Sequence, residues 1–301
     1  MPITKLTQML DILQGKAKRR MVAAFANDAH TICAAYSAIK IGIIEATLVG
    51  DENIIKSICE KHDVPISAFR IVHEPNDVKA ANKAVALINQ GEGDFLMKGL
   101  ISSDKYMRAI LNKETGLINP GAVLSHVTVI EAPAYSKLLI VGDVAIIPQP
   151  DLNQKIAIAN YLIKTAHSLG IEKPKLGIQS ASEMTMPKLS SSADAAIISK
   201  MAQRGQIQGA IVDGPLGLDI MIDPESAEIK GVKSEIKGDT DCILFPNIEA
   251  GNTFYKTMTK LGGAELGALV MGARVPAVLS SRGDSELTKL YSIALAALGC
   301  N

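Results

Sequence analysis

The feature that most constrains the fold of this chain is a repeated alternation between short apolar runs and longer segments with helical periodicity. Runs rich in β-branched residues predict strands at 21–26, 46–49, 69–72, 94–98, 127–131, 138–141, 176–179, 210–212, 242–245 and 266–271. Helical patterns lie between most of them, at 28–41, 78–88, 105–111, 152–169, 193–204 and 253–261. This alternation is typical of a mainly parallel sheet covered by helices, so we predict an α/β fold.

The number of strands bears on domain organisation. About ten strands exceed the usual size of one open sheet, so we predict two α/β domains with mainly parallel sheets and an interdomain cleft. The chain has 301 residues, 48% of them hydrophobic, which is enough for two cores. Candidate boundaries lie at 116–120, 131–136 and 272–276.

Charge and apolar patterning limit the partners and the location. Lys plus Arg and Asp plus Glu both number 31, without long runs of one sign, so broad attraction to nucleic acid or to an anionic membrane is not expected. No apolar run reaches the length of a membrane span, and residues 1–20 lack the pattern of a signal peptide, so we expect a cytoplasmic protein. The four cysteines are scattered in apolar stretches, which predicts reduced thiols and no metal site.

Several familiar motifs are missing from the sequence. There is no GxGxxG fingerprint between a strand and a helix, no GxxxxGK(S/T) loop, no HExxH and no GxSxG elbow before a helix. These absences disfavour Rossmann oxidoreductases, P-loop enzymes, zinc proteases and α/β-hydrolases.

The most informative segment is 275–286, where an apolar strand gives way to small and polar residues before a helical pattern at 287–298. Ser281 and Arg282 stand at this helix start, where free backbone N–H groups and a guanidinium are suited to bind a phosphate or carboxylate. The alternative is that Ser281, Asp284 and Ser285 simply cap the helix while Arg282 is a solvated charge.

Two later strands also end in polar residues. Asp213 and Asp219 follow the strand at 210–212, and could place two carboxylates at a cleft or simply form a turn and a cap. Asn252 follows the strand at 242–245 and could hydrogen-bond a substrate carbonyl, although helix capping by Asn247 or Asn252 is the simpler interpretation.

A further group lies in the first half of the chain. Lys98 ends an apolar strand, Ser102 and Ser103 follow it, and Arg108 lies about one helical turn further on. His126 precedes the strand at 127–131 and could add a polar contact, but a lone histidine is more often structural.

Six short segments together resemble the phosphate acetyl/butyryltransferase family, and are most similar to its butyryltransferase branch. They occur in order along nearly the whole chain: Leu96-Met97-Lys98-Gly99, Leu124-Ser125-His126-Val127, Met201-Ala202-Gln203-Arg204-Gly205-Gln206-Ile207, Val212-Asp213-Gly214-Pro215-Leu216, Glu249-Ala250-Gly251-Asn252 and Ser281-Arg282. Six ordered motifs make a chance match much less probable than one would.

The resemblance implies an enzyme that converts acyl-CoA plus phosphate to acyl phosphate plus CoA, with no tightly bound cofactor and no metal. It implies a two-domain fold similar to that of isocitrate and isopropylmalate dehydrogenases, with the site in the cleft and with homodimers formed through the second domain. By this resemblance the first domain is 1–140 plus 273–301, and the second is 141–272.

The resemblance also implies roles for single residues. Ser281 and Arg282 match the family's Ser-Arg pair, in which the arginine is placed to bind the acyl phosphate and the serine is near the reacting carbonyl. Arg108 matches an arginine that contacts a CoA phosphate, and Lys260 stands where the acetyl-specific branch has another arginine. That branch carries a proposed aspartate base for the CoA thiol where this sequence has Thr288, which cannot act as a base.

The predicted mechanism is direct attack of the CoA thiolate on an acyl phosphate in a ternary complex. We expect Arg282 and Lys260 to stabilise the phosphate, and Ser281 or Asn252 to hydrogen-bond the developing oxyanion. The candidates for handling the thiol proton are Asp219, Asp284, Glu286 and Lys98.

Three alternatives stay open. The first is a phosphate acetyltransferase, since acyl preference is not legible and butyryl is favoured by resemblance alone. The second is a metal-dependent decarboxylating dehydrogenase of the same fold, with Asp213, Asp219 and Asp223 as Mg²⁺ ligands. The third is a non-enzymatic acyl-CoA-binding protein.

Overall fold

The computed structural model describes residues 2–280 and 284–300. The chain folds into two compact units. We call Leu6–Leu124 with Leu266–Asn301 the N-terminal unit, and Met1–Lys5 with Ser125–Glu265 the central unit. The domain boundaries predicted from the sequence, after residues 140 and 272, are not tested by this division and stay a prediction.

The N-terminal unit contains six strands in the order β3-β2-β1-β4-β11-β10. All neighbours are parallel except β10, which runs antiparallel to β11. The strands are β1 (Arg19–Ala24), β2 (Ile44–Gly50), β3 (Arg70–His73), β4 (Phe95–Lys98), β10 (Glu265–Met271) and β11 (Ala277–Val278).

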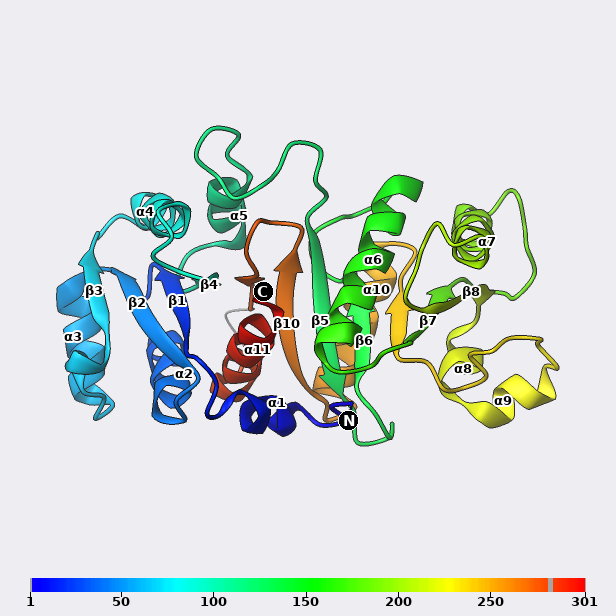
Figure 1. The fold of residues 1–301 in the computed structure, drawn as a ribbon, viewed down its shortest axis with the longest axis horizontal. Helices are drawn as coiled ribbons and strands as arrows, with labels where there is room; N and C mark the ends of the chain where they lie inside the picture. The colour runs from blue at the N-terminus through cyan, green and yellow to red at the C-terminus, as the bar shows by residue number, and fades with distance from the viewer. Residues whose placement is uncertain (1, 281–283, 301) are drawn as a thin grey trace. The chain divides into compact units, whose positions relative to one another are not determined.

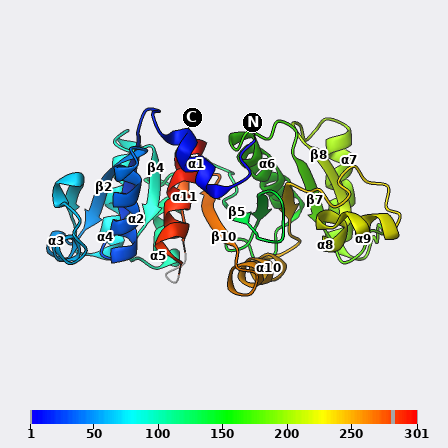
Figure 2. The ribbon, with the colours of Figure 1, turned by 90° about the horizontal axis from the view of Figure 1, so that it is seen from below.

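Helices cover both faces of these strands. One face carries α2 (Ala29–Lys40), α3 (Glu52–Lys61) and α11 (Glu286–Gly299), and the other carries α4 (Asp77–Asn89) and α5 (Ser103–Leu111) (Figures 1 and 2). Helix α1 (Leu6–Leu13) packs on α11. This arrangement follows from right-handed crossovers, because the chain moves outward from β1 to β3 and then returns to β4 across the opposite face.

The central unit contains five strands in the order β5-β6-β9-β7-β8. β5 is antiparallel to β6 and the other pairs are parallel. The strands are β5 (Ser125–Glu131), β6 (Leu139–Gly142), β7 (Lys175–Gln179), β8 (Ile211–Leu216) and β9 (Cys242–Leu244).

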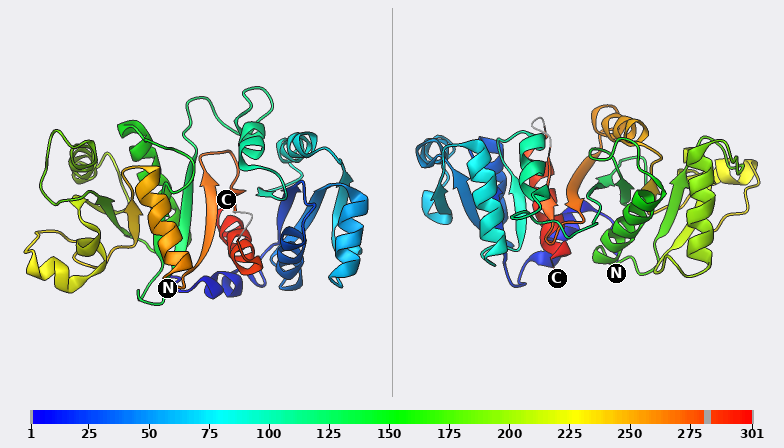
Figure 3. Two further views of the ribbon diagram at one scale, coloured as in Figure 1. Left: turned by 180° about the vertical axis from the view of Figure 1, so that it is seen from behind. Right: turned by 90° about the horizontal axis from the view of Figure 1, so that it is seen from above.

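The helices of the central unit again lie on both faces of its strands. Figure 3 shows α6 (Leu152–Ser168) and α10 (Ile248–Lys260) on opposite faces. Helix α7 (Ser190–Gln203) packs on β7 and β8, and the short α8 (Leu218–Ile222) and α9 (Pro224–Ile229) follow β8. In the parts of the chain that the structure describes, no helix combines the length and apolarity needed to cross a membrane.

The structure confirms the predicted α/β class and all ten predicted strands, which form mostly parallel mixed sheet. Helix α3 was not predicted, because Ile55 and Cys59 are its only buried residues and leave a narrow apolar stripe. The predicted strand at 210–212 was too short, since β8 continues through Asp213, Gly214 and Pro215. Proline is tolerated there because β8 is the last strand of its unit and one of its edges has no ladder to disrupt.

Candidate active site

Three neighbouring parallel strands of the N-terminal unit end side by side. Ala24 of β1 lies opposite Lys98 of β4, and Val278 of β11 lies opposite Met97. Ligands of α/β sheets bind beyond the carboxyl ends of the strands. The polar groups that follow these three strands therefore make one candidate site.

Lys98 is buried at this edge, with 3% of its surface exposed. Its ammonium lies 3.4 Å from the Gly99 carbonyl oxygen. A Cβ added to Gly99 would come within 2.2 Å of the Phe25 carbonyl oxygen, so the chain after β4 packs tightly on the chain after β1. Buried lysines are rare because the charge is costly to desolvate, which distinguishes Lys98 from an ordinary surface cation.

The start of α11 supplies a second buried amine. Lys289 is 4% exposed and its Nζ donates a hydrogen bond of 2.9 Å to Ser280 Oγ, at the end of β11. Burial lowers the pKa of the Lys289 ammonium, and the charges of Asp28 and Asp284 oppose that shift. Two buried amines, Lys98 and Lys289, thus lie near the ends of adjacent strands.

The predicted anion-binding pair, Ser281 and Arg282, lies outside the described residues. What the structure describes on either side is Ser280 and the cap of α11. Ser285 is the N-cap, and its Oγ accepts a hydrogen bond of 3.0 Å from the Thr288 N–H. The Thr288 hydroxyl lies 3.1 Å from the same Ser285 Oγ, so it belongs to the cap.

Three further predicted residues lie at or on α5. Ser102 is its N-cap and accepts a 3.4 Å hydrogen bond from the Lys105 N–H, while Ser103 is exposed in the first turn. Arg108 is highly exposed and pairs with Asp104 at 3.1 Å. Exposed pairs of this kind hold a side chain weakly, so the Arg108 guanidinium is available to a ligand in solution.

In the central unit, the structure reveals a buried carboxylate that the sequence did not single out. Asp143 follows β6 and is 2% exposed. Its Oδ2 accepts hydrogen bonds from Ser125 Oγ at 3.0 Å and the His126 N–H at 3.1 Å, and its Oδ1 accepts from the N–H groups of Ala145 at 2.7 Å and Ile146 at 2.9 Å. Four donors therefore compensate the burial of this carboxylate.

The same network reaches two predicted site residues. His126 is buried, with Nδ1 3.2 Å from Thr128 Oγ1. Asn252 donates from Nδ2 to the Val144 carbonyl oxygen at 3.0 Å, and a Cβ on the preceding Gly251 would lie 2.3 Å from the Asp143 carbonyl oxygen. The loop after β6 is thus hydrogen-bonded to both β5 and α10.

The alternative role of Asn252 as a helix cap is wrong. Asn247 caps α10 by accepting a 3.0 Å hydrogen bond from the Ala250 N–H, and the helix begins at Ile248. Asn252 therefore lies inside the helix, and its side chain contacts the loop that contains Asp143 and Val144. Lys260 is the last residue of α10 and is exposed.

The predicted acidic residues of the central unit have separate partners. Asp219 is about half exposed and pairs with Lys230 at 2.9 Å, which also contacts Glu183 at 3.2 Å; the hydrogen bond from Lys230 lowers the pKa of Asp219. Asp213 accepts from the Gly214 N–H, while Asp223 caps α9. Within residues 2–280 and 284–300, no group of three His, Cys, Asp or Glu side chains is placed to hold a metal ion.

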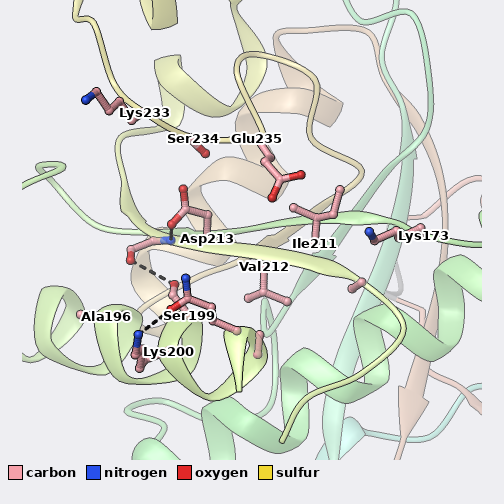
Figure 4. Close-up of a pocket in the computed structure, with 14 residues that line it drawn as sticks. Lys173, Ala196, Ser199, Lys200, Ile211, Val212, Asp213, Lys233, Ser234 and Glu235 are labelled. Carbon is pink, nitrogen blue, oxygen red and sulfur yellow. Dashed lines mark hydrogen bonds between the residues drawn. The ribbon is translucent and has the colours of Figure 1, made fainter. Parts of the chain in front are cut away.

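A cavity of about 480 Å³ lies in the central unit between α7 and β8 (Figure 4). Its lining includes Lys173, Lys200 and Lys233, with Asp213 and Glu235. Ser199 Oγ closes one side by donating to the Gly214 carbonyl oxygen at 3.0 Å. Apart from Asp213, the lining contains none of the predicted site residues.

The chain is similar to known proteins over nearly its whole length. Residues 68–297 match the family model described as Phosphate acetyl/butaryl transferase. The chain is 44% identical to a phosphate butyryltransferase of Clostridium acetobutylicum over 98% of each chain. It is 39% identical to a phosphate acetyltransferase of Thermotoga maritima, covering 97% of this chain and 99% of the relative.

Solved structures agree with these similarities. A branched-chain phosphotransacylase from Enterococcus faecalis superposes with a TM-score of 0.81 at 29% identity, over 94% of this chain and 99% of the other. A phosphotransacetylase from Streptococcus pyogenes gives a TM-score of 0.82 at 21% identity, over 97% of both chains, and supports the fold alone.

Proposed function

Because the chain belongs to the phosphate acetyl/butyryltransferase family and is a phosphotransacylase, we propose that it transfers butyryl, or a similar short or branched acyl group, between CoA and phosphate. The observation that carries this proposal is the near full-length similarity to a phosphate butyryltransferase. The substrates are acyl-CoA and phosphate in one direction, and acyl phosphate and CoA in the other.

The reaction makes two chemical demands. The CoA thiol, for which the cysteine side chain with a pKa of about 8.5 is a model, must lose its proton before it attacks the acyl phosphate carbonyl. The leaving phosphate and the developing oxyanion must then be stabilised by donors and cations.

In this proposal the N-terminal unit provides the anion-binding part of the site. Arg282 binds the phosphate and Ser281 lies near the reacting carbonyl, as the family resemblance implies. The burial of Lys98 near the same strand ends supports this assignment, because a desolvated cation acts strongly on an anion. Ser102 and Ser103 contribute hydroxyls at the start of α5, and Arg108 contacts a CoA phosphate.

The central unit provides the acyl-binding part. Asn252 or Ser281 hydrogen-bonds the oxyanion, while His126 contributes a polar contact and Lys260 an additional positive charge. Asp219 is one candidate to handle the thiol proton. The hydrogen bonds that Asp143 and Val144 make support the placement of His126 and Asn252, because they fix the local backbone and side chain.

The assembly part of the proposal rests on the same resemblance. The two units correspond to two α/β domains of the kind found in isocitrate and isopropylmalate dehydrogenases. The protein is a cytoplasmic homodimer that needs no tightly bound cofactor. Size-exclusion chromatography with light scattering would test the dimer, and full activity of extensively dialysed enzyme would test the last point.

A thiol-release assay tests the function directly. Purified protein is mixed with acetyl-, propionyl-, butyryl- or isobutyryl-CoA, with and without phosphate, and free CoA is measured. We expect phosphate-dependent release with a higher kcat/KM for butyryl- or isobutyryl-CoA than for acetyl-CoA. One methylene is worth about 1–3 kcal/mol in an apolar pocket, so the preference is readily measurable.

A second candidate is acetyl transfer, which the similarity to a phosphate acetyltransferase favours. A higher kcat/KM for acetyl-CoA would select it. NAD(P)H formation that chelators abolish would instead indicate a decarboxylating dehydrogenase. Binding of CoA without any turnover would indicate a non-enzymatic acyl-CoA-binding protein.

Arg282→Ala tests the anion-binding part of the site. We expect turnover to fall by about 10²–10³-fold, the typical cost of losing one strong transition-state donor. Arg108→Ala is the comparison, and should raise the KM for CoA more than it lowers kcat, because its proposed contact is remote from the carbonyl. Near-normal turnover of Arg282→Ala in a folded protein would remove Arg282 from the site.

A further inference from the structure

The structure places a buried serine and a buried lysine in direct hydrogen-bond contact near the ends of strands β4 and β11. Ser280 and Lys289 are 3% and 4% exposed, and the distance from Nζ to Oγ is 2.9 Å. Among the described residues, this is the one hydrogen bond of the Lys289 ammonium, which has three N–H donors. A solely structural lysine at such a position would be expected to have more of its donors satisfied.

The pair also lies close in sequence to Thr288, which stands where the acetyl-specific branch has its proposed base for the CoA thiol. Ser280 directly precedes the Ser281-Arg282 pair, and Lys289 directly follows Thr288, which cannot act as a base. An amine can act as a base when burial favours its neutral form, and burial has that effect on Lys289 by lowering its pKa. Arginine could not act as a base, because its guanidinium stays protonated.

We propose that Ser280 and Lys289 form a proton relay for the CoA thiol, an inference that rests on the phosphotransacylase function. In the direction of acyl-CoA synthesis, the thiol S–H bond breaks and its proton passes to Ser280 Oγ as the Ser280 proton passes to neutral Lys289. The thiolate electron pair then forms the C–S bond to the acyl carbon. The bond from that carbon to the phosphate oxygen breaks, and phosphate leaves with the electron pair.

The charges around Lys289 suit a group that gains and loses a proton. Asp28, which precedes α2, and Asp284, which precedes α11, both raise the pKa of Lys289 and so favour its protonated form. Asp28 Oδ1 caps α2 by accepting from the Thr31 N–H, but its buried Oδ2 accepts no hydrogen bond from a described residue. The negative charge of Asp28 therefore favours an ammonium formed on Lys289.

Other ionisable groups on the packed elements have their own contacts. Glu286 on α11 accepts a 3.1 Å hydrogen bond from Ser37 on α2, and burial raises the pKa of the Cys33 thiol on the same helix as Ser37. Lys98 lies at the end of the neighbouring strand β4 and is itself buried. Within the described part of the chain, neither Glu286 nor Cys33 makes a hydrogen bond to Ser280, so Lys289 is the assigned terminal acceptor.

Substitutions at Lys289 separate proton transfer from charge. Lys289→Ala should lower kcat for acyl-CoA synthesis by about 10²–10⁴-fold, the usual contribution of a general base. Lys289→Arg should be similarly impaired, because arginine keeps the charge but does not lose its proton. Ethylamine should restore activity to Lys289→Ala in proportion to the concentration of its neutral form, and the rise of wild-type kcat with pH should be absent from both variants.

Lys155→Met is a matched control. Lys155 is also 4% exposed, but it pairs with Asp194 on α7 in the central unit at 2.6 Å. This variant should lose stability and keep its pH profile. Active Lys289→Arg, or folded Lys289→Ala that ethylamine does not rescue, would overturn the relay.

Ser280→Ala covers the case in which the lysine variants fail to fold. It removes the relaying hydroxyl and should lower kcat, whereas unchanged kcat across the pH range would overturn the relay. The wild-type protein is measured in the same assay. If wild type shows no phosphate-dependent exchange, the proposed function fails, and if wild type is active while these variants are unimpaired, only the relay fails.

Discussion

Asp143→Asn is the sharpest test of how the central part of the site is held together. The substitution keeps the shape of the side chain but replaces one carboxylate oxygen by an NH₂ group. If the amide oxygen stays with Ala145 and Ile146, the NH₂ group faces Ser125 Oγ and the His126 N–H. The serine hydroxyl can rotate and accept, but the backbone N–H of His126 cannot.

The expected loss in the free energy of unfolding follows from the donors that lose their acceptor or keep a weaker one. One buried N–H without an acceptor costs about 1–3 kcal/mol. Loss of the negative charge weakens the two hydrogen bonds that remain on the amide oxygen, by about 1 kcal/mol in total. The free energy of unfolding should therefore fall by about 2–4 kcal/mol, which moves a urea midpoint by about 1–2 M for a typical denaturant slope.

The measurement is urea unfolding followed by circular dichroism, because the chain contains no tryptophan. Asp151→Asn is the matched control, since Asp151 caps α6 at the surface and asparagine is an equally good cap. The control's free energy of unfolding should stay within about 0.5 kcal/mol of wild type. If Asp143→Asn shifts the midpoint no more than the control does, the Asp143 network does not hold this loop. Thiol release should also fall in Asp143→Asn, because His126 and Asn252 lose their support.

Three further predictions test other parts of the structure. Gly251→Ala should destabilise the protein by about 1–3 kcal/mol in urea unfolding, because its Cβ would lie 2.3 Å from a backbone oxygen; wild-type stability would contradict the packing of α10. Burial and, secondarily, two nearby aspartates raise the pKa of the Tyr135 hydroxyl, which donates to the Thr240 carbonyl oxygen. As the pH rises, this hydroxyl therefore ionises in the unfolded state before it ionises in the folded state. The free energy of unfolding of the wild type should then fall more steeply than that of Tyr135→Phe above about pH 10. Parallel plots of the two free energies against pH would refute this. Asp219→Asn should change stability little, because the Lys230 pair is exposed, and unchanged thiol release would remove Asp219 from the candidates for the thiol proton.

Much of the sheet and some of the site followed from local patterns. Apolar runs identified the strands because burial on both faces of a parallel sheet leaves a continuous signal in the sequence. Lys98 was singled out for the same reason, since a lysine that ends such a run is hard to place in solvent. The structure shows that Lys98 is buried, and its role in binding stays a prediction.

The residues that were missed depend on contacts between distant segments. Asp143 looked like an ordinary loop residue, because its partners Ser125 and His126 lie on another strand, 17 to 18 positions away. Lys289 fitted a regular helical pattern and became notable only because α11 packs against α2 and buries it. No local signal distinguishes such residues from solvated charges.

The sequence by itself determined the α/β class, the strand positions, the family and therefore the phosphotransacylase reaction. These properties are encoded by periodicity and by motifs of neighbouring residues, which survive without knowledge of the packing. Tertiary structure alone decided that Asn252 lies within α10, that Asp143 accepts four hydrogen bonds, and that Lys289 meets Ser280. The physical reason is that burial and hydrogen bonding depend on which elements are neighbours in space, and strand order and helix packing set those neighbours.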